Sequence, residues 1–274
     1  MTLRHLLLIL FFLTFPHHAA AWNDEITGME FVKVPAGCFK IGNLSRDEID
    51  NAGKSTGEIC VEAFYIGKYE VTNAQFRNFN REHDSGSYNG DSLNSCNQPV
   101  VNVSWNDAVK FAQWLSRETG RVFRLPTEIE WEYAARGGAT DRNYYGDGVR
   151  DVCGYTKIAE DDPKLGFSIS NNCTGIQAAT SEVGSSRPNG FGLYDMVGNA
   201  WEWSGEWFKE DYAGTPPPES RHTGATGSDL TDRCGCWYDG IPVVRAAIRY
   251  NSTLGYRNFN LGFRLVSPLD QTPQ

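Results

Sequence analysis

The sequence predicts a loop-rich α+β domain with little regular secondary structure, in which a small set of helices packs on irregular sheets. Helix signals are confined to three short stretches, and the apolar runs elsewhere are short and strand-like. The chain carries 28 glycines and 12 prolines in 274 residues, as expected of a loop-rich fold. Long loops in a compact domain usually need cross-links or ions, and seven cysteines are available. We therefore expect cross-links to carry part of the stability.

The helices and strands can be placed from local signals. Each predicted helix starts at a threonine or serine, and the second and third end at a glycine; they run from Thr72 to about Arg81, Ser104 to Gly120, and Thr127 to Gly137. Glu130 completes a T-x-x-E capping box with Thr127, and Asp107 is placed to cap the second helix. The strand-like runs are Phe31 to Pro35, Cys60 to Tyr65, Val243 to Tyr250 and Gly262 to Val266.

Residues 1–21 have the pattern of a secretory signal peptide. Arg4 is followed by an apolar stretch from Leu6 to Phe15 and by the A-x-A site Ala19–Ala21. An apolar run of about ten residues is too short to span a bilayer, which needs about 20, and no later segment is apolar enough to do so. We expect cleavage after Ala21, leaving residues 22–274 as a single domain in the periplasm or secreted.

Charge and histidine content exclude several classes of function. The formal net charge is -9, with no run of Lys or Arg, which argues against a nucleic-acid partner. Removal of the signal would also remove His5, His17 and His18, and would leave His83 and His222, both expected at the surface. A Ser-His-Asp triad or a multi-histidine metal site is therefore not expected.

Six motifs occur in order along nearly the whole mature chain. They are Phe31–Gly37, Phe64–Asn73, Pro99–Trp105, Arg124–Arg136, Pro188–Trp203 and Leu261–Arg264. In these segments the chain resembles the formylglycine-generating enzyme, or sulfatase-modifying factor, family. The resemblance implies a C-type-lectin-like α+β fold with low regular secondary structure, in agreement with the pattern above.

The resemblance also implies a structural calcium site at Asp195, Gly198, Ala200 and Glu202. The two acids offer carboxylates, and the other two residues match positions that offer carbonyl oxygens, the ligands that calcium prefers. The residues alone leave a second reading open, in which the acids cap a helix or lie at the surface. A second family calcium site, at Asn171 or Asn172, is not predicted because the matching acid is missing.

The family's oxidase chemistry is not expected in this chain. The formylglycine-generating enzyme oxidises a sulfatase cysteine with dioxygen and a copper(I) ion held by two thiolates. The matching positions hold Asp239 and Val244, and neither side chain can be a thiolate. The adjacent Arg-Gly-Gly-Ser-Trp motif of the family is matched by Arg233–Trp237, in which Cys234 and Cys236 replace a glycine and the serine.

The candidate catalytic residues are Cys234, Cys236, Asp239 and Arg245, beside an expected cleft near Trp237. The Cys-Gly-Cys pair has three readings: two structural half-cystines, a thiol site for redox chemistry or a displaced Cu(I), or one reactive thiol beside a disulfide-bonded cysteine. The arginines near the end of the chain also have two readings, as ligands for a carboxylate or phosphate or as structural ion-pair partners; they are Arg245, Arg249, Arg257 and Arg264.

Disulfide pairs follow from the expected fold and an oxidising compartment. The fold would place the strands of Cys38 and Cys60 side by side, and Cys153 and Cys173 bracket the loop before the calcium motif. Cys96 would then pair with Cys234 or Cys236, which leaves one thiol.

Two functions from different classes remain open. The chain is a maturation or tailoring factor, as the family's periplasmic siderophore-maturation branch would allow, or it is a non-catalytic module. In the first case the ligand is a peptide, protein or small molecule; in the second, a peptide or glycan is bound in the lectin-like cleft.

Overall fold

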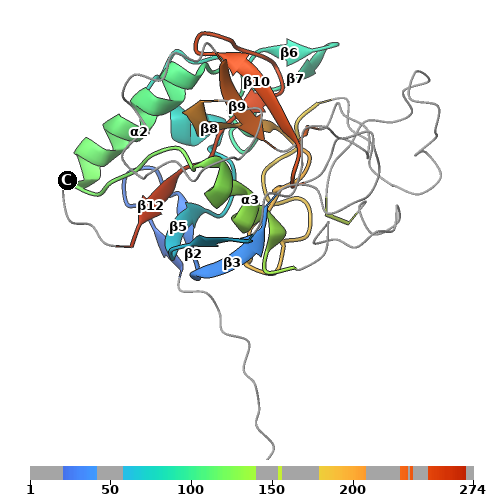
Figure 1. Ribbon diagram of the computed structural model, residues 1–274. Helices are drawn as coiled ribbons and strands as arrows, with labels where there is room; N and C mark the ends of the chain where they lie inside the picture. The colour runs from blue at the N-terminus through green and yellow to red at the C-terminus, as the bar shows by residue number, and fades with distance from the viewer. Residues whose placement is uncertain are drawn as a thin grey trace, which may run out of the picture.

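Two four-stranded sheets form the centre of the protein. The computed structural model describes residues 21–41, 58–139, 154–155, 179–207, 229–233, 235–236 and 246–269 (Figure 1). The first sheet has the antiparallel order β1 (Ala21–Asn23), β2 (Glu30–Val34), β5 (Phe64–Gly67), β12 (Val266–Pro268). The second has the order β10 (Arg249–Thr253), β9 (Asp229–Arg233), β8 (Trp201–Trp207), β11 (Leu261–Gly262), with β11 parallel to β8.

Two small hairpins and three helices complete the described part. The hairpins are β3 (Gly37–Lys40) with β4 (Glu58–Val61), and β6 (Ser87–Tyr88) with β7 (Asp91–Ser92). The helices are α1 (Asn73–Phe76), α2 (Trp105–Thr119) and α3 (Glu128–Arg136). The predicted α+β class with few regular elements is confirmed.

Capping residues set the ends of α2 and α3 at the positions that the sequence predicts. Ser104 and Thr127 both make full capping boxes, with Asp107 and Glu130 respectively. Gly120 and Gly137 end α2 and α3 in the left-handed conformation that glycine adopts without steric cost. The first helix is shorter than predicted: its regular part ends at Phe76, and turns continue from there.

Two predicted strands are each divided in two. The run Cys60 to Tyr65 is interrupted at residues 62–63, so β4 joins a hairpin while β5 enters the first sheet. The run Gly262 to Val266 is interrupted at residues 263–265, so β11 joins one sheet and β12 the other. Residues 263–265 therefore connect the second sheet to the first. All three, Phe263, Arg264 and Leu265, are buried.

An aromatic cluster under α2 dominates the core. Phe111 of α2 stacks on Phe76 at 5.3 Å between ring centroids and meets Phe263 edge-on at 5.6 Å. Trp203 of β8 is fully buried in the same cluster, and its indole donates to the Val103 carbonyl at 3.0 Å. This packing holds β8, and hence the segment that precedes it, against the helix.

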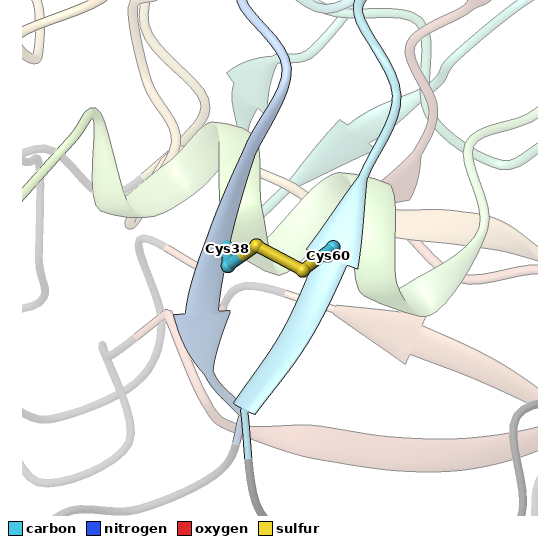
Figure 2. Close-up of a disulfide and its surroundings, with 2 residues drawn as sticks. All are labelled: Cys38 and Cys60. Carbon is cyan, nitrogen blue, oxygen red and sulfur yellow. A yellow bond between two sulfur atoms is a disulfide. The ribbon is translucent and has the colours of Figure 1, made fainter.

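The hairpin β3–β4 carries the predicted disulfide between Cys38 and Cys60 (Figure 2). The two cysteines are direct partners across the antiparallel strands, and both are exposed. The predicted pairing of Cys96 is wrong for Cys236: Cys96 is an exposed thiol in the turn before Pro99, whereas Cys236 is fully buried elsewhere. Cys153, Cys173 and Cys234 lie outside the described residues.

The predicted cleavage site lies at the start of the first sheet. Residues 1–20 lie outside the described part, and Ala21 begins β1 opposite Val32. Within the described residues, no helix combines the length and apolar composition that crossing a bilayer requires.

His83 is not at the surface as predicted. It is partly buried, its ring packs edge-on against Phe76 at 4.8 Å, and burial lowers its pKa.

Candidate functional site

The segment from Asp195 to Glu202 is the buried centre of the candidate site. Asp195, Gly198 and Asn199 have φ values of 56°, 84° and 59°, a left-handed region that favours Gly and Asn/Asp. Each residue from 195 to 200 is buried, and the chain then enters β8. The reading of these acids as surface groups is therefore wrong, because both carboxylates are in the interior.

Glu202 is held by a buried guanidinium. Arg264 donates from Nε to Oε1 and Oε2 at 3.0 and 2.8 Å, and from Nη2 to Oε1 at 2.7 Å. The indole of Trp131 in α3 donates to Oε2 at 2.8 Å. Burial alone disfavours the cation, but the Glu202 carboxylate outweighs it and the pKa of Arg264 is raised. The Arg264 guanidinium also donates to the Gly67 and Tyr194 carbonyls, so this ion pair ties both sheets together.

Glu70 is an acid that the sequence analysis missed. It is 1% exposed, and neither carboxylate oxygen has a hydrogen-bond partner within the described part of the chain. Burial, followed by the nearby charge of Asp195, raises the pKa of Glu70 well above its usual range, while Arg264 opposes the shift. The charges of Glu70, Asp195 and Glu202 all act on the Arg264 guanidinium.

The calcium site expected here is compared with the oxygen atoms that the described residues offer. Among the described residues the Glu70 carboxylate has no hydrogen-bond partner, and carboxylates and carbonyls are the oxygen donors that calcium takes. No group of three or more acidic, histidine or cysteine side chains is arranged as a ready ligand set among the described residues. Carbonyl oxygens, as expected for Gly198 and Ala200, would have to complete the shell.

The structure brings the segment from Asp195 to Glu202 into contact with Gly235. The Gly198 amide donates to the Gly235 carbonyl at 3.1 Å. Cys236 is 0% exposed, and its sulfur accepts a hydrogen bond from Asn260 Nδ2 at 3.1 Å. Asn260 in turn accepts from the Trp201 amide at 2.8 Å through its carbonyl. The candidates Cys234, Asp239 and Arg245 lie outside the described residues, as do Trp237, Val244, Asn171 and Asn172.

A second buried ion-pair network supports the strand that leads to Cys236. Arg233, fully buried at the end of β9, donates to Glu128 and Glu132 of α3 at 3.1 Å each. Arg249 of β10 donates to Glu128 Oε1 at 3.0 Å, and Thr231 donates to the same oxygen at 2.7 Å. The i, i+4 spacing of the two glutamates was the available sequence signal, since it puts both on one helix face.

The three C-terminal arginines that the structure describes are structural. Arg249 pairs with Glu128, Arg264 with Glu202, and Arg257 with Asp107. The interpretation of these three arginines as structural ion-pair partners is thus confirmed, because each one is paired with an acid of the protein itself. Arg245 remains the untested member of the set.

Comparison with known proteins identifies the family. Residues 18–269 match the model of the sulfatase-modifying factor enzyme 1-like domain. The chain belongs to this family.

Relatives of the sulfatase-modifying factor family agree with this assignment. The formylglycine-generating enzyme of Streptomyces coelicolor is 38% identical over 184 residues, which cover 64% of this chain and 54% of that protein. The chain thus spans about half of that relative. The Bos taurus formylglycine-generating enzyme is 27% identical over 294 residues, covering 87% of this chain and 74% of that protein. The structure of PvdO from Pseudomonas aeruginosa superposes with a TM-score of 0.77 and 25% identity, over 92% of this chain and 98% of that one.

Proposed function

We propose that this protein is an exported maturation or tailoring factor that acts without the copper–thiolate chemistry of the formylglycine-generating enzyme. The observation that carries the proposal is the pair Cys236 and Asn260, joined to the calcium motif through Gly235 and Gly198. The chain keeps the scaffold at this position, while Asp239 and Val244 stand where the two thiolates would be. A protein that keeps the family's fold but lacks the copper ligands would catalyse a reaction that does not use copper.

Calcium would serve structure in this proposal. The candidate ligands are Asp195, Glu202 and the carbonyls of Gly198 and Ala200. Bound calcium would offset the excess negative charge that Glu70 adds, and would hold the segment that contacts Gly235. The protein's own residues already orient that segment, since Arg264 holds Glu202 from the side of the first sheet.

A non-catalytic binding module is the alternative, favoured by two observations. The Cys236 side chain is fully buried, so its sulfur is withdrawn from a ligand in this conformation. At the edge of the second sheet, Tyr250 is 60% exposed and lies 6.3 Å from the Trp201 ring, which provides an aromatic surface for a peptide or glycan.

Copper binding tests the proposed loss of oxidase chemistry. The mature chain is titrated with Cu(I) against a chromogenic chelator, and then incubated with dioxygen and a synthetic peptide carrying the sulfatase cysteine. We expect neither tight Cu(I) binding nor conversion of the peptide, with the Streptomyces enzyme as positive control. Stoichiometric Cu(I) binding together with peptide oxidation would overturn the proposal.

A matched pair of variants sharpens this test. Asp239→Cys combined with Val244→Cys restores the thiolates, whereas Asp239→Ser with Val244→Ser changes the same positions without sulfur. We expect Cu(I) binding in the cysteine pair alone, because soft thiolates select Cu(I). Equal binding by both pairs would show that the copper site lies elsewhere.

The mass of a peptide after incubation with the protein distinguishes an enzyme from a non-catalytic binding module. A random peptide library is incubated with the protein, and the retained peptides are analysed by mass spectrometry. The enzyme proposal expects retained or released peptides of altered mass, lost in Asn260→Ala. Recovery of bound peptides with unchanged mass would support the binding module instead.

A further inference from the structure

The bond at which the signal peptide is expected to be cleaved lies inside the folded first sheet. Cleavage after Ala21 breaks the peptide bond between Ala21 and Trp22, and both residues belong to β1. They stand opposite Val32 and Phe31 of β2 in the antiparallel ladder. The bond to be cleaved is thus part of the folded domain itself. The inference drawn from this placement rests on the proposed export of the chain.

Trp22, the first residue after that bond, is held by the rings and the cation around it. Its ring stacks on Phe31 at 4.8 Å between centroids, with 13° between the ring planes. Tyr65 of β5 meets it edge-on at 6.0 Å, and the Arg121 guanidinium carbon lies 4.3 Å from the ring centroid. Aromatic pairs and cation–π contacts each add to the stability that buried area gives. Removing β1 from the sheet therefore means breaking these contacts together.

A tight turn holds β1 on β2 at its other end. Asp24 is 2% exposed, and its carboxylate accepts from the Thr27 amide at 2.7 Å and from the Ile26 amide at 3.3 Å. The Gly28 amide donates to the Asp24 carbonyl at 2.9 Å, and Gly28 has a φ of 73°, which glycine adopts without strain. These contacts join residues close in sequence, and hairpins of this kind form within about 1–10 μs. Pairing of β1 with β2 can therefore occur early in folding.

The backbone of Ala21 and Trp22, and not the side chain of Ala21, is what the sheet protects. The Ala21 side chain is exposed, so the small residue that a signal peptidase reads stays visible. A protease takes an extended segment into its cleft, and a segment paired in a sheet must first leave it. Cleavage of the folded chain is then limited by the small population in which β1 is open.

We propose that β1 protects its own processing site, so that signal removal and docking of β1 compete. In a chain cleaved before folding, one water is consumed, Ala21 leaves with a carboxylate, and Trp22 becomes the first residue with a free ammonium. A chain in which β1 docks first keeps its signal peptide, because the bond is then paired in the sheet. Efficient maturation therefore requires that the chain cross the membrane unfolded and be cleaved before the first sheet closes.

Purified signal peptidase tests this on the full-length precursor. The precursor is produced without export in an oxidising cytoplasm, so that the Cys38–Cys60 bridge forms, and a synthetic peptide of residues 10–30 serves as the unfolded substrate. We expect the folded precursor to be cleaved at least about a hundredfold more slowly than the peptide, by kcat/KM. Equal rates would overturn the proposal. A peptide that is not cleaved after Ala21 would refute the predicted site itself, and with it the signal peptide on which the proposed export rests.

A spacer between Ala21 and Trp22 separates protection from recognition. About five Gly and Ser residues inserted there leave Ala19–Ala21 unchanged and move the bond away from the sheet. We expect the folded precursor with this spacer to be cleaved at a rate within about threefold of the peptide. A precursor that stays resistant despite the spacer would show that pairing of β1 is not the cause, and would overturn the proposal.

Two substitutions weaken the docking of β1 without a spacer. Trp22→Ala should speed cleavage of the folded precursor about tenfold or more, while a peptide with the same change is cleaved as before. Arg121→Gln removes the cation from the ring without touching the cleaved segment, and should give a smaller increase. Near-ultraviolet circular dichroism checks that each precursor is folded. Unchanged cleavage of both folded variants would contradict a protective role for the Trp22 contacts.

Discussion

Replacing Asp232 by asparagine should make the protein more stable above neutral pH. Asp232 lies in β9 between its cross-strand partners Trp203 of β8 and Tyr250 of β10. It is 4% exposed, and Oδ1 has no hydrogen-bond partner among the described residues. Oδ2 accepts a long bond, 3.4 Å, from Ser252 Oγ. An ionised carboxylate is therefore poorly solvated here.

The magnitude follows from the shift in pKa. Burial raises the pKa of Asp232 from 3.8 to about 7, and the bond from Ser252 opposes the shift only in part. Because the pKa is raised, the native state holds its proton after the unfolded chain has lost it. Between pH 4 and pH 7 the native state consequently loses stability as pH rises, by up to about 4 kcal/mol in total. Above pH 7 both states are ionised and the loss is constant.

Asparagine has the same shape and does not titrate. We expect Asp232→Asn to match the parent within about 1 kcal/mol at pH 4, where the parent side chain is neutral, and to exceed it by about 2–4 kcal/mol at pH 8. Urea unfolding at each pH, followed by tryptophan fluorescence at constant calcium, measures both proteins. The difference between the two curves isolates Asp232, because other groups titrate alike in both.

Two results would refute this reasoning. One is a free-energy difference that does not change between pH 4 and pH 8, which would mean that Asp232 titrates normally. The other is a variant less stable than the parent at pH 8, which would mean that the carboxylate has a stabilising partner in the native state.

The other predictions concern ion pairs on the same scaffold. Asp107→Asn should lower stability by about 0.5–1.5 kcal/mol at neutral pH, because it weakens the α2 cap and the partly exposed Arg257 pair. Since the pKa of Asp107 is lowered by its Ser104 and Arg257 partners despite burial, this loss should vanish in acid, as thermal melts at pH 7 and pH 2.5 would show. Glu128→Ala should cost about 3–5 kcal/mol in urea unfolding, because two buried guanidinium groups lose a partner, and a loss under 1 kcal/mol would contradict the network. Glu202→Ala should abolish calcium binding in isothermal titration, and an unchanged stoichiometry would exclude Glu202 as a ligand.

The sequence predicted features set by neighbours along the chain. The capping boxes at Ser104 and Thr127 involve residues three apart, so their pattern is visible in one dimension. Motif order also predicted the family, and the family implied that Cys38 and Cys60 lie on adjacent strands, as the register confirms.

The sequence failed where neighbours come from distant segments. A run such as Gly262 to Val266 looks continuous, yet its two halves join different sheets because each pairs with a strand from elsewhere in the chain. Cys96 was assigned a partner by elimination, although only the tertiary structure shows it exposed.

The amino-acid sequence by itself determined the fold class, the ends of α2 and α3, the family and the absence of thiolates at positions 239 and 244. The tertiary structure decided which acids are electrostatically unusual. Glu70 and Asp232 stand in ordinary sequence contexts, and burial raises the pKa of each. For Glu70 the charge of Asp195, which is distant in the sequence, adds to the shift. Desolvation is a sum over everything that surrounds a group in space, and no local pattern encodes it.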